Sequence, residues 1–347
     1  MTPAKLPSKI NFCQASNLAL DWALANDPTV FLLGEDIADE EGGGVLTVTR
    51  GLSTRHGTER VRSTPISEQA IVGAAIGASL VGMRPVAEIM MMDFAMVAMD
   101  QIVNHAAKLR FMSGGQTFVP ITLRMASGVG GGTGGQHADM YEAMFAHVPG
   151  LKVAVPSTPA DAYGLLLSCI FDNDPCIFVE NFVSMFAHTS SMPEPGYRVP
   201  LGKANVEREG ADVSVIGYGH PLVDVRKVAD KLQLEGISVE IVDLRTVAPL
   251  DMDTVLTSVE KTGRAVVIHE AVKSFGVGAE VSARIAESLL GRLKAPVQRI
   301  GGRNSPVPFS RPLEQAYMWN AEEIERAIRL TLRSDVPLNP SEASITV

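Results

Sequence analysis

The sequence predicts an α/β protein built from two doubly wound domains, and three observations lead to this prediction. Short runs of β-branched residues alternate with longer stretches at helical spacing, which is typical of mostly parallel sheets flanked by helices. The chain has 347 residues, whereas a single hydrophobic core stops growing near about 250–300 residues. Between residues 181 and 201 the periodicity fails and prolines accumulate, as in a linker. We therefore expect one domain over residues 1–190, a linker over 191–205 and a second domain over 206–347.

The first domain begins with a helical pattern in which Ala15, Leu18, Ala19 and Trp22 share one face. Apolar runs then predict strands over 30–33, 86–90, 121–125, 153–155 and 177–179. The segments between them predict helices over 68–80, 94–112 and 160–171. Small residues in the first of these helices permit close packing.

The same rhythm restarts after the linker. Apolar runs predict strands over 213–216, 239–242, 265–268 and 297–300. Amphipathic segments predict helices over 222–234, 252–261, 277–290 and 321–332. The second domain is thus expected to contain four βα units and a mostly parallel sheet.

Composition excludes several classes of partner. With 30 Lys+Arg against 39 Asp+Glu the net charge is −9, so we expect no binding to nucleic acid. No window offers the roughly 18 uninterrupted apolar residues that cross a bilayer, so we expect no membrane association. Three cysteines form neither a CxxC pair nor a disulfide framework, and the first residues resemble no leader peptide. We therefore expect a reducing, cytoplasmic location.

The run GGGTGG at residues 130–135 satisfies the GxGxxG pattern of dinucleotide-binding loops. That pattern also requires a helix directly after the glycines and an acid about 20 residues further on, whereas Asp139 and Glu142 come too early. We interpret the run as a flexible loop that delivers His137. The sequence also lacks GK[ST], HExxH and any other spacing of a closed metal site, so no protein-only metal centre is expected.

Glu68 is the most suggestive carboxylate of the chain. It follows the extended segment 64–67 and opens an almost wholly apolar helix. On spacing alone two interpretations stay open: a structural acid favoured by the helix dipole, and an acid/base group.

Seven blocks in one order, within residues 11–333, carry a resemblance to a known family. They read LLGEDIA (32–38), TPISEQAIVGAAIGAS (64–79), DQIVNHAAKLRFMSGG (100–115), HVPGLKVAVPSTPADAYGLL (147–166), DLRTVAPLD (243–251), KTGRAVVIHEA (261–271) and PVPFS (306–310). In these blocks the chain resembles the beta subunits of thiamine-diphosphate-dependent 2-oxo acid dehydrogenases, a transketolase-like group that includes pyruvate, branched-chain and acetoin enzymes. The resemblance implies an N-terminal transketolase-like pyrimidine-binding domain and a transketolase-type C-terminal domain.

The resemblance also implies a thiamine diphosphate site. Glu68 matches the glutamate that shares a proton with N1′ of the cofactor's aminopyrimidine and so promotes loss of the thiazolium C2 proton. Phe94 matches the aromatic ring stacked on the pyrimidine, and Ile66 matches an apolar contact to it. Glu35 matches an acid of a buried polar passage between paired sites, with a simple capping role equally open.

His137 matches the family histidine at the mouth of the site, which handles protons as the acyl group passes to a lipoyl arm. The family usually reads Gln-His-Ser-Gln, whereas this chain reads Gln136-His137-Ala138-Asp139, so the acceptor stays open. Some relatives bind a structural potassium ion through mainly backbone oxygens, at positions that match Ile121, Cys169, Ile170, Asp172 and Asp174.

The Gly-Asp-Gly motif with which thiamine enzymes hold Mg²⁺ and the diphosphate occurs nowhere in the sequence. The resemblance therefore implies a separate alpha subunit that ligates Mg²⁺, an α2β2 heterotetramer active only with that subunit, and a lipoyl acyltransferase core as acceptor. Residues 43–52 and the pair Asp93-Phe94 favour the pyruvate and acetoin branches without settling the substrate. Two alternatives stay open: a split transketolase or other carboligase subunit, and a noncatalytic scaffold that docks the acyltransferase core.

Overall fold

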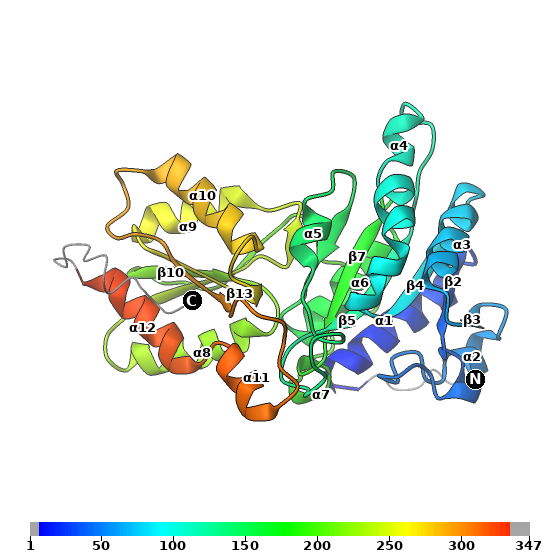
Figure 1. Cartoon of the computed structure of the whole chain (residues 1–347), viewed down its shortest axis with the longest axis horizontal. Helices are drawn as coiled ribbons and strands as arrows, with labels where there is room; N and C mark the ends of the chain where they lie inside the picture. The colour runs from blue at the N-terminus through cyan, green and yellow to red at the C-terminus, as the bar shows by residue number, and fades with distance from the viewer. Residues whose placement is uncertain (1–6, 334–347) are drawn as a thin grey trace. The chain divides into compact units, whose positions relative to one another are not determined.

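The computed structural model describes residues 7–333, which form two compact units (Figure 1). Within this range the first unit comprises residues 7–128, 144–201 and 246–249. The second comprises residues 129–143, 202–245 and 250–333. The sequence-based limits are linear, whereas in the structure segment 129–143 joins the second unit and segment 246–249 joins the first. Residues 1–6 and 334–347 of the expected domains lie outside the described residues.

Within the described first unit, a seven-stranded sheet has the order β12-β6-β7-β5-β4-β2-β3. All neighbours are parallel except β12, which pairs antiparallel with β6. The strands are β2 (Val30–Glu35), β3 (Val61–Thr64), β4 (Arg84–Met91), β5 (Thr122–Ser127), β6 (Lys152–Ala154), β7 (Cys176–Asn181) and β12 (Thr246–Ala248). β2, β5 and β7 are buried at every position, as expected for a parallel sheet covered on both faces. A separate antiparallel pair joins β1 (Lys9–Ile10) to β8 (Ser190–Ser191).

Helices cover this first sheet on both faces. α1 (Phe12–Asn26) begins at a capping box in which Asn11 and Gln14 exchange hydrogen bonds. It packs against α6 (Pro159–Ile170), and the two share one apolar cluster with the strands. α3 (Glu68–Leu80) contacts β4 and β2 but contributes nothing to that cluster, so it covers the other face. The shorter helices are η1 (Asp39–Glu41), α2 (Leu52–His56), α5 (Glu142–Ala146) and α7 (Ser184–Ala187).

The helix expected over residues 94–112 is helical but changes its winding along its length. A 3₁₀ segment, η2 (Met92–Ala98), is followed by a π-helix, η3 (Asp100–Ala106), and then by the short α4 (Leu109–Met112). Over such short segments the spacing of apolar residues does not distinguish 3₁₀-, π- and α-helical winding, so the sequence pattern could not separate them. Both unusual windings concentrate at functional sites in proteins.

The second unit is built on a sheet whose five described strands have the order β14-β13-β10-β11-β9. Only β9 runs antiparallel, at the edge. The strands are β9 (Asn205–Arg208), β10 (Val213–Gly217), β11 (Val239–Asp243), β13 (Ala265–Val272) and β14 (Gln298–Gly302). The four strands expected from the sequence are thus present, and β9 extends the sheet.

Two pairs of helices enclose this second sheet (Figure 1). α8 (Pro221–Gln233) and α12 (Ala321–Leu332) share an apolar cluster with the strands on one face. α9 (Met252–Thr262) and α10 (Val277–Leu289) pack together on the other. The short α11 (Arg311–Tyr317) precedes α12. The prediction of two doubly wound α/β domains is confirmed, and none of the helices in residues 7–333 is long and apolar enough to cross a membrane.

Candidate active site

Three neighbouring strands of the first sheet, β4, β2 and β3, end beside one another at their carboxyl edge. Glu35 is the last residue of β2, and Ile66 and Glu68 follow the end of β3. Phe94 lies just after the end of β4. The structure therefore brings these four predicted residues to one edge of one sheet, where parallel α/β proteins bind ligands.

Glu68 is the first residue of α3 and is only 8% exposed. Among the described residues no donor makes a hydrogen bond to its carboxylate, and Ser67 does not cap the helix with its side chain. Buried polar groups usually have a partner. A nearly buried carboxylate at the positive end of a helix is therefore available to a bound group that carries a proton or a donor.

Glu35 is buried beside Glu68. Burial raises the pKa of Glu35, and the charge of Glu68 raises it further, while a hydrogen bond from the backbone of Ser67 opposes the shift. Two acids in one low-dielectric place disfavour double ionisation. The arrangement therefore favours the protonated form of Glu35.

Phe94 and Ile66 provide the apolar part of this edge. Phe94 is half-buried in η2, which packs against α3. Ile66 is 83% exposed, whereas Glu68, two residues later, is nearly buried. A large apolar side chain exposed at such an edge is suited to contact a ligand or a partner.

His137 lies in the segment 129–143, which belongs to the second unit. The helix that a dinucleotide loop would require does not follow the glycines, because α5 begins only at Glu142. The Thr133 hydroxyl donates to the His137 carbonyl at 3.3 Å. The predicted residues are thus divided between the units, with His137 in the second and the carboxylates in the first.

The candidate potassium positions lie at the opposite, amino edge of the first sheet, before β5 and β7. The Arg84 guanidinium donates to the carbonyls of Ile170 and Asp172, at 3.3 and 2.7 Å. The carbonyls of Ile121 and Cys169 accept backbone N–H groups. Each carbonyl keeps a second lone pair, and a potassium ion at these oxygens stays a prediction from the resemblance.

The two carboxylates of this candidate potassium set are already neutralised. Lys152 contacts Asp172 at 2.7 Å and Asp174 at 3.2 Å, and Arg110 also pairs with Asp174. Among the described residues no group of three or more His, Cys, Asp or Glu side chains could hold a metal ion. A cation here would depend on backbone oxygens.

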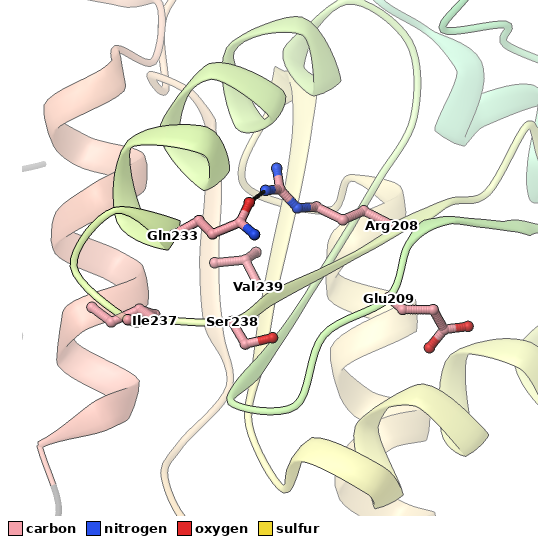
Figure 2. A pocket seen from close by; sticks show the side chains of 7 residues that line it. Arg208, Glu209, Gln233, Ile237, Ser238 and Val239 are labelled. Atoms are coloured by element: carbon pink, nitrogen blue, oxygen red, sulfur yellow. Dashed lines mark hydrogen bonds between the residues drawn. The ribbon is translucent and has the colours of Figure 1, made fainter.

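Two cavities lie away from the carboxyl edge. One of about 690 Å³ in the first unit is lined by Phe111, Pro149 and Asp174, among others. Another of about 160 Å³ in the second unit lies between β9 and the end of α8 (Figure 2). There Arg208 is already paired with Gln233 and Asp230, so it offers no open charge to a ligand.

The first sheet also contains a buried ionic triad that was not predicted from the sequence. Arg124 on β5 contacts Glu88 on β4 and Glu180 on β7, each at 2.6 Å, and Ser16 donates to Glu180 at 2.8 Å. Arg124 is 2% exposed. The signal was a charged residue near the middle or end of each of three mostly apolar strands, since charges are rarely buried unless paired.

Known families match both halves of the chain. Residues 8–182 match the transketolase pyrimidine binding domain and residues 202–324 the transketolase C-terminal domain. A solved structure described as a split gene transketolase, inactive beta4 tetramer, has the same fold, with a TM-score of 0.74 at 22% identity over 93% of this chain and 98% of that one. Fold and site thus define a two-domain protein of the transketolase type.

Comparison with curated relatives identifies the family within the transketolase type to which the chain belongs. The chain is 46% identical to the acetoin:2,6-dichlorophenolindophenol oxidoreductase subunit beta of Cupriavidus necator, over 94% of this chain and 98% of that protein. It is 42% identical to the pyruvate dehydrogenase E1 component subunit beta of Bacillus subtilis, over 94% and 99%. The chain belongs to the family of beta subunits of acetoin and 2-oxo acid dehydrogenases.

Proposed function

We propose that this chain is the beta subunit of a thiamine-diphosphate-dependent dehydrogenase that decarboxylates a 2-oxo acid such as pyruvate, or cleaves acetoin, and passes the acyl group to a lipoyl acyltransferase. The observation that carries the proposal is the nearly buried carboxylate of Glu68 at the carboxyl edge of the first sheet, to which no donor among residues 7–333 makes a hydrogen bond. The names of the relatives supply the reaction class.

The residues at this edge fit the pyrimidine half of the cofactor. When bound, thiamine diphosphate supplies a carbon nucleophile and an electron sink for the bond that breaks beside the substrate carbonyl. Glu68 would hold a proton at its carboxylate against the aminopyrimidine. Phe94 would stack on the ring, worth about 0.5–1.5 kcal/mol beyond burial, and Ile66 would add an apolar contact.

The diphosphate half requires another chain. The sequence lacks a Gly-Asp-Gly motif and carries a net charge of −9. A diphosphate shielded from water needs a cation or an aligned helix N-terminus. We therefore assign Mg²⁺ binding to an alpha subunit, in an α2β2 heterotetramer, and expect negligible cofactor binding by this chain alone.

His137 is the proposed proton donor and acceptor during acyl transfer. The residue two positions later is Asp139, where the family usually has glutamine. Burial raises the pKa of Asp139, while a hydrogen bond from Tyr141 at 3.1 Å opposes the shift. The direction of this shift reduces the electrostatic difference between Asp139 and a neutral glutamine, so lipoamide is kept as the proposed acceptor.

The experiment uses the chain assembled with its alpha partner. Pyruvate, a branched-chain 2-oxo acid and acetoin are each supplied, first with an artificial electron acceptor and then with lipoamide. We expect one of the three to give turnover with both acceptors. His137→Ala should lower lipoamide-dependent turnover at least about 10-fold more than turnover with the artificial acceptor, whereas the control His105→Ala, exposed on η3, should lower neither.

Other outcomes of these assays would contradict the proposal. A complete complex that turns over none of the three substrates, yet joins a two-carbon unit to an aldehyde, would identify a carboligase subunit instead. Full activity after substitution of both Glu68 and His137 would leave the chain as a scaffold. Equal losses in the two His137→Ala assays would show that His137 acts before acyl transfer.

A further inference from the structure

The glycine run at 130–135 forms a turn whose backbone N–H groups converge on one acceptor. Successive N–H groups in such a turn make a concave site for anions. Its occupant is a side chain of the same unit, because Glu314 Oε1 accepts from Gly130 N–H at 2.8 Å and from Gly132 N–H at 3.1 Å. A carboxylate of the protein therefore fills the place that the sequence pattern would give to a phosphate.

The Glu314 carboxylate and the two glycine N–H groups satisfy each other's hydrogen-bonding needs. It is the fourth residue of α11 and only 2% exposed. Among the described residues no lysine or arginine pairs with it, and the two glycine N–H groups are the donors to its carboxylate. Because a buried charge needs such charge-assisted hydrogen bonds, neither partner can leave without penalty.

Apolar packing seats the same loop on the segment around α11. Val129 and Ala138 from the loop form a small buried cluster with Val307 and Tyr317. Gly134 has a φ of +74° and lies so near Phe309 that an added Cβ would be 3.1 Å from its ring. The loop and this segment are therefore fitted to each other along the glycine run.

Two further acids fix the ends of the loop. Glu270 on β13 accepts from Val129 N–H at 2.5 Å. At the other end the Tyr218 hydroxyl donates to Glu142 at 2.7 Å. His137 lies between these anchors, so its backbone position follows from contacts made by the second unit.

We propose that Glu314 is a positioning residue for His137: its carboxylate holds the glycine turn, and the turn sets where the histidine is presented. The inference rests on the proposed role of His137 in acyl transfer. Loss of Glu314 would loosen the loop while leaving the carboxyl edge of the first sheet, with Glu68, unchanged. Misplacement of a reacting group by about 1 Å can lower a rate about 10²-fold.

The test compares Glu314→Ala, Glu314→Gln and the control Gln315→Ala in the assembled complex. Gln315 is the exposed neighbour on α11. Hydrogen exchange read by mass spectrometry over residues 129–136 should accelerate about 10- to 100-fold in Glu314→Ala, less in Glu314→Gln, which keeps an oxygen acceptor, and not in the control. Exchange in β10 and β13 should stay unchanged, which shows that the unit remains folded.

Kinetics complete the test. In Glu314→Ala the kcat with lipoamide should fall about 10- to 100-fold, with the artificial acceptor rate within about 2-fold of wild type. Wild-type exchange in the loop would overturn the anchor, and faster exchange with unchanged lipoamide turnover would overturn the positioning role. If Glu314→Ala does not fold, the same readings are taken on Glu314→Gln. A wild-type complex without lipoamide-dependent activity would overturn the proposed function, and with it the positioning role, while the exchange data still decide the anchor.

Discussion

Glu270 allows the electrostatics of the second unit to be tested quantitatively. It lies on β13 and is 2% exposed. Burial raises its pKa from the ordinary 4.5 to about 8; the hydrogen bond from Val129 opposes this shift and the nearby charge of Glu142 adds to it. The folded protein therefore holds Glu270 protonated near neutral pH, whereas the unfolded chain releases the proton.

The sign and size of the stability effect follow from linkage. Because the folded pKa is above the unfolded one, the contribution of Glu270 is fully present below about pH 4.5 and is lost as the pH rises to about 8. At about 1.4 kcal/mol per pKa unit, the whole loss is on the order of 5 kcal/mol. Between pH 6 and pH 9 it amounts to on the order of 3 kcal/mol.

The measurement is urea unfolding of the full chain, wild type against Glu270→Gln. The sequence has two tryptophans, Trp22 in the first unit and Trp319 in the second. In a Trp22→Phe background the fluorescence of Trp319 reports on the second unit. We expect the wild-type unfolding free energy to fall about 3 kcal/mol further than that of the variant between pH 6 and pH 9.

Glu280→Gln serves as the matched control, because Glu280 is exposed on α10. It should leave the wild-type pH dependence in place. Parallel pH dependence in wild type and Glu270→Gln would refute the argument, since it would mean that Glu270 titrates alike in folded and unfolded chains. A variant less stable than wild type at pH 9 would show that the Val129 hydrogen bond outweighs the burial of the charge.

Three further predictions concern the first unit. Glu68→Gln should keep the wild-type melting temperature yet lower turnover of the assembled enzyme about 10²–10⁴-fold with an artificial acceptor; near wild-type turnover would make Glu68 a helix-terminal acid only. Arg124→Met should lower the unfolding free energy by about 3–5 kcal/mol in urea titrations, because Glu88 and Glu180 would remain buried without their cation; a loss below about 1 kcal/mol would contradict this account. Exchanging NaCl for KCl at equal ionic strength should stabilise the chain and raise its melting temperature if potassium binds near Asp172, with a gain in unfolding free energy of up to about 2.7 kcal/mol at 100 times the Kd; identical melting curves would contradict the predicted potassium site.

The central strands were predictable because their physics is local. A parallel strand covered on both faces reads as a continuous apolar run, as in β2, β5 and β7. The edge strands lack that signal: β3 and β9 carry polar residues at exposed or half-exposed positions, and β12 is only three residues long. Their pairing is decided by neighbours far along the chain.

The residues of the site likewise fall into those that a local pattern identifies and those that only the fold brings together. Glu35 and Glu68 could be named because each stands in a block that resembles the family, and Phe94 because it follows the recognisable strand β4 and matches a family position. The triad of Arg124, Glu88 and Glu180 joins three strands, and no local pattern states which strands are adjacent. A rule that asks for the partner of every charge inside an apolar strand would have identified all three.

The loop that carries His137 shows what local patterns leave out. Glycines at 130–135 free the backbone from any regular ladder, so their N–H groups must find acceptors elsewhere or remain exposed to water. The acceptor is Glu314, 184 residues away from Gly130, and its own sequence context, an acid in a short helix, is ordinary. The N–H groups of this turn imply that an acceptor exists, but the sequence does not indicate which residue it is. The substitutions that test the loop are therefore made at Glu314 on α11, outside the glycine run and away from His137 itself.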